Sequence, residues 1–354
     1  DSLNQLGRAR AEAKALQNLY NKKYGTKADK WKKKATEQER DSYAAITKKI
    51  KFIKQSLIFL CRDEYPNESL AWVDSCLVVN DDEIAWSPVL GSGGVDGRME
   101  FSANYLLNVI EIVDNDSSSA WLEKSLFDEG APALVNTSVG QFAPGAVGGA
   151  NATQGMEGDS TVNPWDYVLM IEGVVLLAGS VSRKLGVNQG PRAAFPFTVY
   201  SQAAGQSSLG QREVREARGE IWVPLWIRPA GIVEIKQVLS EGRAELRAKQ
   251  SYSTVDFARA VAGLGIDRGI SSFSRQGFLK RNGLSFIAIP LGRFDVRARE
   301  QVDLLREPER WLKKLRSACK VGKKGEAPER VTGALRGIDS AIFDYCRYGG
   351  RSRF

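Results

Sequence analysis

The segment Arg268 to Asn282, RGISSFSRQGFLKRN, combines cations, small polar residues and aromatic rings. Cations with Ser and Asn donors bind phosphate, and exposed aromatic rings stack on nucleotide bases. The candidate contacts are Arg268, Arg275, Lys280, Arg281 and Asn282, with Arg293, Arg297 and Arg299 downstream. We expect nucleic-acid contact here. In the alternative interpretation, Phe273 and Phe278 belong to the core and only the cations are exposed.

Two further groups of cations carry the same chemistry. The sequence near its start is rich in lysine, and the candidate contacts there are Lys30, Lys32, Lys33 and Lys34. Lysine is a point charge suited to non-specific attraction of phosphate, although such residues also serve solubility alone. The second group is Arg183, Lys184 and Arg192. It follows an apolar segment, where cations either complement a helix dipole or bind phosphate.

Two glycine-rich stretches allow close approach of the backbone to a ligand. They are LGSGGVDGRMEFSANY, from Leu90 to Tyr105, and the stretch from Gly140 to Gly173. Neither contains the GxxxxGK[ST] pattern of nucleotide-binding loops. The candidate contacts are Gly91, Gly93, Gly94, Gly97, Arg98, Gly148, Gly149, Asn151 and Gln154. We expect these loops either to enter a DNA minor groove or abut an RNA, or to pack tightly against another subunit.

The chain contains no histidine. This excludes Ser-His-Asp and Cys-His nucleophile systems, histidine general bases and histidine-ligated zinc. Acidic residues that could in principle bind Mg²⁺ for phosphodiester cleavage are Asp81, Asp82, Glu83, Asp96 and Glu100. Their spacing matches no known metal motif. Turn and cap roles, or a face turned to a basic protein, are the preferred interpretation, so we expect no catalytic residue, metal or cofactor.

The four cysteines, Cys61, Cys76, Cys319 and Cys346, form no CxxC pair. This pattern is typical of buried free thiols in a reducing cytosol, so we expect a cytoplasmic protein. The most apolar segment, Tyr167 to Val181, is too short for a membrane span and contains Glu172. A buried core helix is expected there instead.

Charge divides the chain into blocks. Residues 1–60 hold 15 Lys and Arg against 6 Asp and Glu, a net of +9. Residues 61–160 hold 3 against 17, a net of −14, and residues 161–354 hold 32 against 19, a net of +13. Basic blocks of this size suit a polyanionic partner such as nucleic acid.

The hydrophobic pattern predicts an α+β fold, an irregular mixed body between helical N- and C-terminal segments. Residues 1–62 are expected to form a basic helical segment, 63–300 the α+β body with the glycine-rich loops, and 301–354 a helical end. Within the body we predict strands near residues 71–84, 193–200, 220–226 and 286–291. Helices are predicted from Ser102, Pro164, Val233 and Asp256. The start without Met and the abrupt end predict a piece of a longer protein.

Several motifs, taken in order, resemble one family. They are LGSGGVDGRMEFSANY, GQFAPGAVGGANATQG, NPWDYVLMIEG, AAFPFTVY, EIWVPLWIRPA, DFARAVAGLGIDRGI and GFLKRNGLSFIAIPLGR. Their combination resembles the large subunit of the type I-G (formerly I-U) CRISPR Cascade surveillance complex, over Leu70 to Arg297. The chain departs from the family at Val95, where Asn is usual, and family members extend further at both ends.

The resemblance implies a non-catalytic subunit that contacts guide RNA and target DNA beside the backbone and other subunits. Such a subunit probes the protospacer-adjacent motif in duplex DNA, promotes strand opening and supports recruitment of a helicase-nuclease. RNA–DNA pairing reads the sequence, whereas the protein reads the short motif and the backbone shape. No membrane is involved. Two alternatives stay open: a carboxylate–Mg²⁺ nuclease of the same defence pathway, and a purely structural scaffold.

Overall fold

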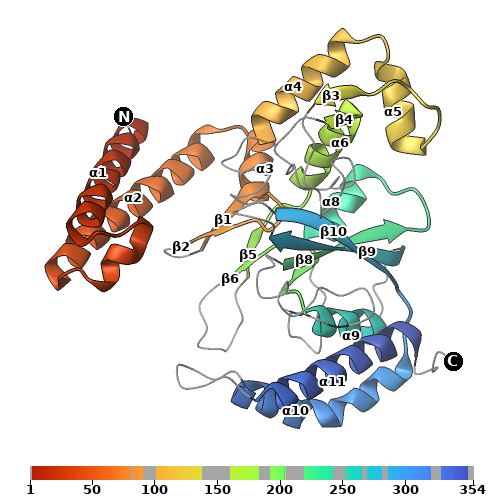
Figure 1. The fold of residues 1–354 in the computed structure, drawn as a ribbon. Coiled ribbons are helices and arrows are strands. Elements are labelled where there is room, and N and C mark those ends of the chain that lie inside the picture. Colours follow the sequence, from red (N-terminus) through yellow and green to blue (C-terminus); the bar gives the residue numbers. More distant parts are fainter. Residues whose placement is uncertain are drawn as a thin grey trace. The chain divides into compact units, whose positions relative to one another are not determined.

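The computed structural model describes residues 2–80, 83–90, 101–137, 160–182, 192–202, 204, 219–240, 242, 251, 253–264, 269–280, 286–319 and 328–349. The chain is a mixed α+β protein with small antiparallel sheets and helices at both ends (Figure 1). This confirms the fold class predicted from the sequence. The chain divides into two compact units, residues 1–73 with 79–84 and residues 74–78 with 85–354.

The first unit is built on a helical hairpin. Its elements are α1 (Ser2–Tyr24), the 3₁₀ helix η1 (Ala28–Lys33) and α2 (Glu37–Glu64). The helix α1 ends at Gly25, whose φ of 59° is the left-handed conformation that glycine adopts without strain. The two long helices are antiparallel, because Leu6 packs near Ile53 whereas Tyr20 packs near Tyr43. The helical character predicted for the N-terminal segment is therefore confirmed.

Between residues 67 and 86 the prediction is partly wrong. We predicted a strand from Ala71 to Ile84, but the first part of that segment belongs to a helix, α3 (Asn67–Cys76). Two short strands follow, β1 (Leu77–Asn80) and β2 (Glu83–Trp86), and they pair with each other. A short apolar run does not distinguish a helix from a strand by its period, which explains the error.

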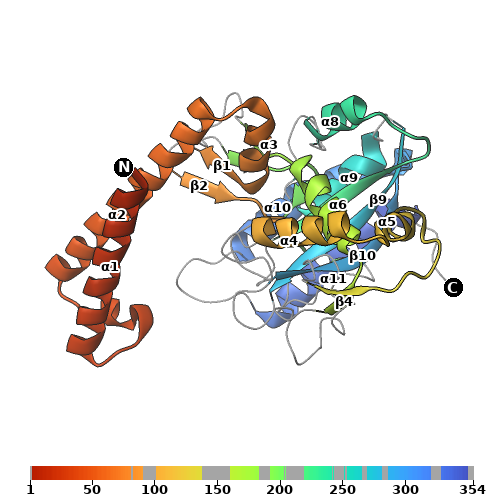
Figure 2. The same cartoon turned by 90° about the horizontal axis from the view of Figure 1, so that it is seen from above.

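Three helices of the second unit form a group, and one of them is the predicted core helix, α6. The elements are α4 (Phe101–Asp114), α5 (Ser118–Phe127), α6 (Pro164–Val175), β3 (Val135–Thr137) and β4 (Ser160–Val162). The Asn163 side chain caps α6 by accepting a hydrogen bond from the Trp165 N–H, and Pro164 opens the helix. Both α4 and α5 pack on α6, as the view from above shows (Figure 2).

A four-stranded antiparallel sheet lies at the centre of the second unit. Its strands, in the order β10-β9-β8-β7, are β10 (Phe286–Asp295), β9 (Ile270–Lys280), β8 (Gly219–Trp226) and β7 (Thr198–Val199). A separate pair is formed by β5 (Ser180–Ser182) and β6 (Arg192–Ala194). The register of β10 shifts between Pro290 and Gly292, where a β-bulge leaves Leu291 without a partner in the ladder.

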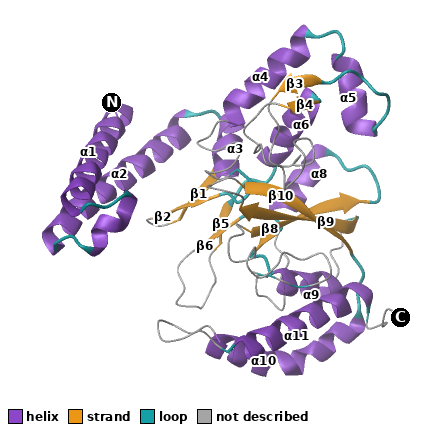
Figure 3. Cartoon of the chain, in the orientation of Figure 1, coloured by secondary structure: helices purple, strands orange, loops and turns teal. Residues whose placement is uncertain are grey.

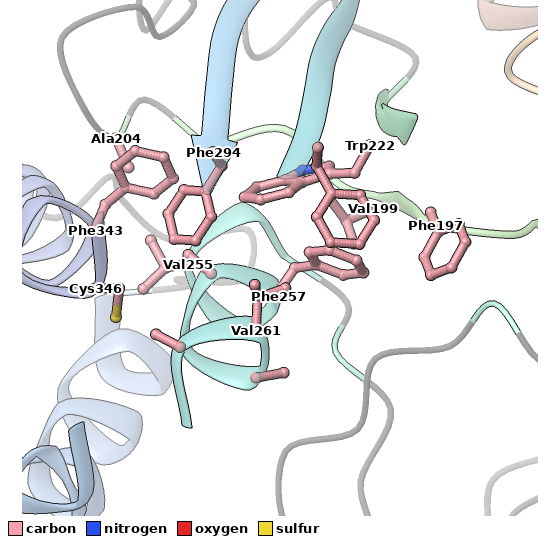
Figure 4. Packing of buried hydrophobic residues seen from close by; sticks show 14 of the residues in the cluster. Phe197, Val199, Ala204, Trp222, Val255, Phe257, Val261, Phe294, Phe343 and Cys346 are labelled. Carbon is pink, nitrogen blue, oxygen red and sulfur yellow. The ribbon is translucent and has the colours of Figure 1, made fainter. Parts of the chain in front are cut away.

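Helices cover one face of this sheet, as the purple and orange elements of Figure 3 show. They are α9 (Thr254–Leu264), η4 (Glu300–Leu305), α10 (Arg306–Cys319) and α11 (Glu329–Tyr348). The helix α8 (Ile232–Ser240) adds Val238 and Leu239 to the same core cluster. The indole of Trp222 on β8 packs against Phe257 of α9 and Phe294 of β10, and Phe294 meets Phe343 of α11 (Figure 4). These rings form the main hydrophobic core. Within the described residues no helix is long and apolar enough to cross a membrane.

Candidate nucleic-acid interface

The end of the helical hairpin, residues 20–43, is called the hairpin tip below. Its centre is Trp31, which is fully buried although lysines flank it in the sequence. Its ring lies 4.7 Å from the ring centroid of Tyr20 and 5.2 Å from that of Tyr43. Because aromatic packing of this kind fixes the turn between α1 and α2, the lysines are attached to an ordered backbone.

A single carboxylate joins the two helices at the hairpin tip. Glu39 on α2 accepts hydrogen bonds from Lys23 Nζ at 2.6 Å and from the Tyr24 hydroxyl at 2.5 Å, both at the end of α1. It also accepts from the Thr36 N–H at 2.9 Å, and the Thr36 hydroxyl in turn accepts from the Glu39 N–H. Thr36 and Glu39 therefore form a capping box. Hydrogen bonds from Lys23, Tyr24 and Thr36 lower the pKa of the Glu39 carboxyl to about 2.

The lysines of the hairpin tip surround this core. Exposed side chains there are Lys22, Lys23, Lys27, Lys30, Lys33 and Lys34, whereas Lys32 is half-buried. The Lys32 ammonium lies 4.9 Å from the centroid of the Tyr43 ring, a cation–π geometry. The predicted lysines Lys30, Lys33 and Lys34 thus lie together at the surface. The arrangement presents several positive charges on a fixed support, which suits phosphate.

The structure places the other main candidate, Arg275, in the interior instead. Its side chain is 1% exposed, and Nε donates to Glu220 Oε1 at 2.7 Å. The guanidinium lies 5.1 Å from the centroid of the Trp222 ring and 4.5 Å from that of the Phe343 ring, both within cation–π distance. Thr254 adds a hydrogen bond to the same carboxylate, from Oγ1 to Oε2 at 2.7 Å. Arg275 is therefore part of the core and not available to a phosphate at the surface, contrary to our expectation.

The aromatic residues of the same segment are also interior. Phe273 and Phe278 are both fully buried on β9, so the interpretation of these rings as base-stacking platforms is wrong. We missed β9 itself. Its residues alternate between two faces, so Phe273 and Arg275 share one face of the sheet. Phe273 and Phe278 are five positions apart and so lie on opposite faces, and the apolar residues of the segment show no period of two that would have indicated a strand.

Two downstream arginines of this region remain at the surface. Arg293 is exposed, and its Nε donates to Ser272 Oγ at 2.7 Å. Arg297 is exposed as well. Arg299 has a structural contact, because it donates from Nε to the Cys346 carbonyl at 3.0 Å and from Nη2 to the Arg347 carbonyl at 2.7 Å. It therefore satisfies carbonyls in the last turn of α11.

The remaining candidates lie outside the described residues. These are Arg268, Arg281, Asn282, Arg183, Lys184, Gly91, Gly93, Gly94, Gly97, Arg98, Gly148, Gly149, Asn151 and Gln154. Lys280 is the last residue of β9 and Arg192 the first of β6, but the side chains of both also lie outside. Their expected contacts stay predictions.

The described part of the chain contains both carboxylates that could bind a metal and cysteine thiols. No three Cys, Asp or Glu side chains within it gather to hold a metal ion. Asp81, Asp82, Asp96 and Glu100 lie outside it, as does the side chain of Glu83. Burial raises the pKa of the Cys76 thiol to about 11 and that of Cys346 to about 12. Such thiols are unreactive near neutral pH.

The residues that sequence reasoning missed are Glu39, Thr36 and Glu220. The first two were readable, because a Thr followed three residues later by Glu is the pattern of a capping box. Glu220 carried no local signal, since its partner Arg275 is 55 residues away. Searches of protein-family models and of curated proteins find no match to this chain.

Proposed function

We propose that this chain is a non-catalytic nucleic-acid-binding subunit of a guide-RNA ribonucleoprotein, and that the hairpin tip contacts phosphate. The observation that carries the proposal is the group of exposed lysines held around buried Trp31. Each lysine that neutralises a phosphate releases counterions, so binding rests on charge and not on base sequence. A backbone that is already ordered adds little conformational cost when phosphate binds.

The finer assignment rests on the ordered motifs from Leu70 to Arg297. Their resemblance to the type I-G Cascade large subunit supports a role beside guide RNA and target DNA, in contact with the backbone subunits. In that role the chain recognises the protospacer-adjacent motif, helps to open the duplex and supports recruitment of a helicase-nuclease. The lysines of the hairpin tip would follow a nucleic-acid backbone and supply affinity, without reading the motif.

The first experiment neutralises the hairpin tip. The triple variant Lys27→Gln, Lys30→Gln and Lys33→Gln removes three exposed ammonium groups for which no hydrogen bond within the protein is described. On duplex DNA, the slope of log affinity against log salt should become less steep by about 2–3, because each neutralised phosphate accounts for about 0.9 of that slope. Fluorescence anisotropy of labelled duplex and of single-stranded RNA, at several salt concentrations, measures this change.

The matched control removes the same charge from the same unit. Lys48→Gln, Lys49→Gln and Lys51→Gln alter three exposed lysines of α2 outside the hairpin tip. This control should change the salt slope much less. Equal changes in both triple variants, or none in either, would show that the hairpin tip is not a specific phosphate site.

A second experiment addresses the role in the complex. Target-duplex binding is compared for the guide-RNA complex reconstituted with and without this subunit, at two salt concentrations. Motif-dependent binding should be lost without the subunit while assembly persists. Unchanged binding would instead support the scaffold alternative. Metal-dependent cleavage that disappears on Asp96→Asn and Glu100→Gln would support the nuclease alternative.

A further inference from the structure

The outward face of α4 carries large apolar side chains in the open. Leu106, Leu107, Ile110 and Val113 are between 56% and 75% exposed. Positions 106, 110 and 113 follow the spacing that places residues on one side of a helix, with 107 beside them. Asp114, at the helix end, is the one charged residue on this side. These four apolar residues are called the α4 face below.

The opposite side of α4 is already occupied by its own unit. Phe101 and Ile112 are buried, and α4 packs on α6. The Tyr105 hydroxyl donates to Glu172 of α6 at 2.6 Å, and the bond raises the pKa of Tyr105 to about 12, so the link persists at neutral pH. The helix is thus apolar on both sides. A helix of that kind is normally enclosed, yet no described residue covers the α4 face.

The stretch of sequence that begins with α4 is acidic. Residues 101–137 contain six acidic residues, Glu111, Asp114, Asp116, Glu123, Asp128 and Glu129, against one basic residue, Lys124. That lysine is engaged, since its Nζ lies 2.6 Å from Asp128 Oδ1. The local charge is therefore negative next to an apolar stripe.

We propose that the α4 face binds a basic amphipathic helix of a partner protein. The apolar residues of the partner would pack between those at positions 106, 107, 110 and 113, and its flanking Lys or Arg would meet Asp114 and Asp116. Charge complementarity selects this occupant. An anionic membrane would be repelled by this acidic segment, and a second copy would bring a segment of the same negative charge against it. The proposal is independent of the lysines of the hairpin tip.

The full chain is tested with a synthetic peptide of about 18 residues, about five helical turns, composed of Leu and Lys in amphipathic spacing. A matched peptide carries Glu in place of Lys. Fluorescence anisotropy should show binding of the Lys peptide at least about tenfold tighter than that of the Glu peptide. The double variant Leu106→Gln and Ile110→Gln should weaken binding of the Lys peptide at least about tenfold. Asp114→Asn should reduce the difference in affinity between the Lys peptide and the Glu peptide.

Folding and specificity are checked in parallel. Gln is a good helix former and both positions are exposed, so the melting temperature of the double variant should equal that of the wild type. The control Ile232→Gln and Val233→Gln alters an equally open pair on α8 and should leave peptide binding unchanged. The proposal would be overturned if both peptides bound with equal affinity, or if the control variant lost as much affinity for the Lys peptide as the double variant. It would also be overturned if the chain bound anionic vesicles or a second copy of itself and the double variant abolished that binding.

Discussion

The hairpin tip and strand β9 both combine cations with aromatic rings in the sequence, yet the fold uses them in opposite ways. At the hairpin tip the ring of Trp31 is buried and most of its lysines face solvent. On β9 the ring of Phe273 and the guanidinium of Arg275 are buried together. The cations of the first region are available to a partner, and Arg275 is not.

The chemistry of the two side chains explains the difference. The planar guanidinium of Arg275 contacts two aromatic rings and donates directionally to Glu220, so it can be accommodated in a core. The strongly hydrated ammonium of lysine has no such geometry, and its flexible stem keeps the charge in water. Aromatic neighbours in the sequence therefore do not by themselves indicate a nucleic-acid surface.

The largest expected effect breaks the buried pair of β9. Arg275→Leu leaves the carboxylate of Glu220 buried without its ionic partner, which should lower the free energy of unfolding by about 3–5 kcal/mol. Urea denaturation followed by circular dichroism measures the change. The double variant Arg275→Leu with Glu220→Leu should recover most of the loss, and Arg297→Leu at the surface should change stability by less than about 0.5 kcal/mol. If Arg275→Leu and Arg297→Leu lowered the free energy of unfolding by nearly the same amount, a core role for Arg275 would be contradicted.

A smaller effect is expected at the capping box of the hairpin tip. Thr36→Ala removes the side-chain acceptor for the Glu39 N–H and should destabilise α2 by about 1 kcal/mol. Thr47→Ala is the matched control, because Thr47 donates to the Tyr43 carbonyl in the middle of the same helix, where Ala is the better helix former. Hydrogen exchange of α2 should become faster in Thr36→Ala and should stay equal or become slower in Thr47→Ala. If the exchange rate changed in the same direction in both variants, the capping box would have no stabilising role.

The smallest effect is a pH dependence confined to the hairpin tip. The pKa of Glu39 is lowered to about 2 from an ordinary value of 4.5, so its stabilisation is complete above pH 4.5 and is lost as the pH falls toward 2. Hydrogen exchange of residues 20–43, corrected for the intrinsic rate, should show weaker protection over that range. Glu39→Gln should remove this dependence, whereas Glu37→Gln on the same turn should retain it. If the hairpin tip were equally protected from hydrogen exchange at pH 2.5 and pH 6, the stabilising role of the Glu39 carboxylate would be contradicted.

Much of the fold was predictable because its signals are local. The periodic apolar residues of α2, the stop at Gly25 and the Asn163–Pro164 start of α6 each depend on neighbours in sequence. Strand β9 and its ion pair were not predicted, because burial of Arg275 is decided by Glu220 and Phe343, far away in the chain. For the interface, sequence located the lysines but not the Glu39 contacts that join the two helices of the hairpin tip.

The bulge of β10 has a consequence for self-association. In the described sheet β10 lies at one edge, where unpaired N–H and C=O groups would accept another strand. Pro290 has no N–H, Gly292 adopts a φ of 88°, and the carbonyl of Leu291 faces Arg275 Nη1 at 3.5 Å. A straight strand from another molecule therefore cannot form a continuous ladder of hydrogen bonds along β10. By engaging the Leu291 carbonyl, the buried Arg275 takes one acceptor of this edge away from an incoming strand.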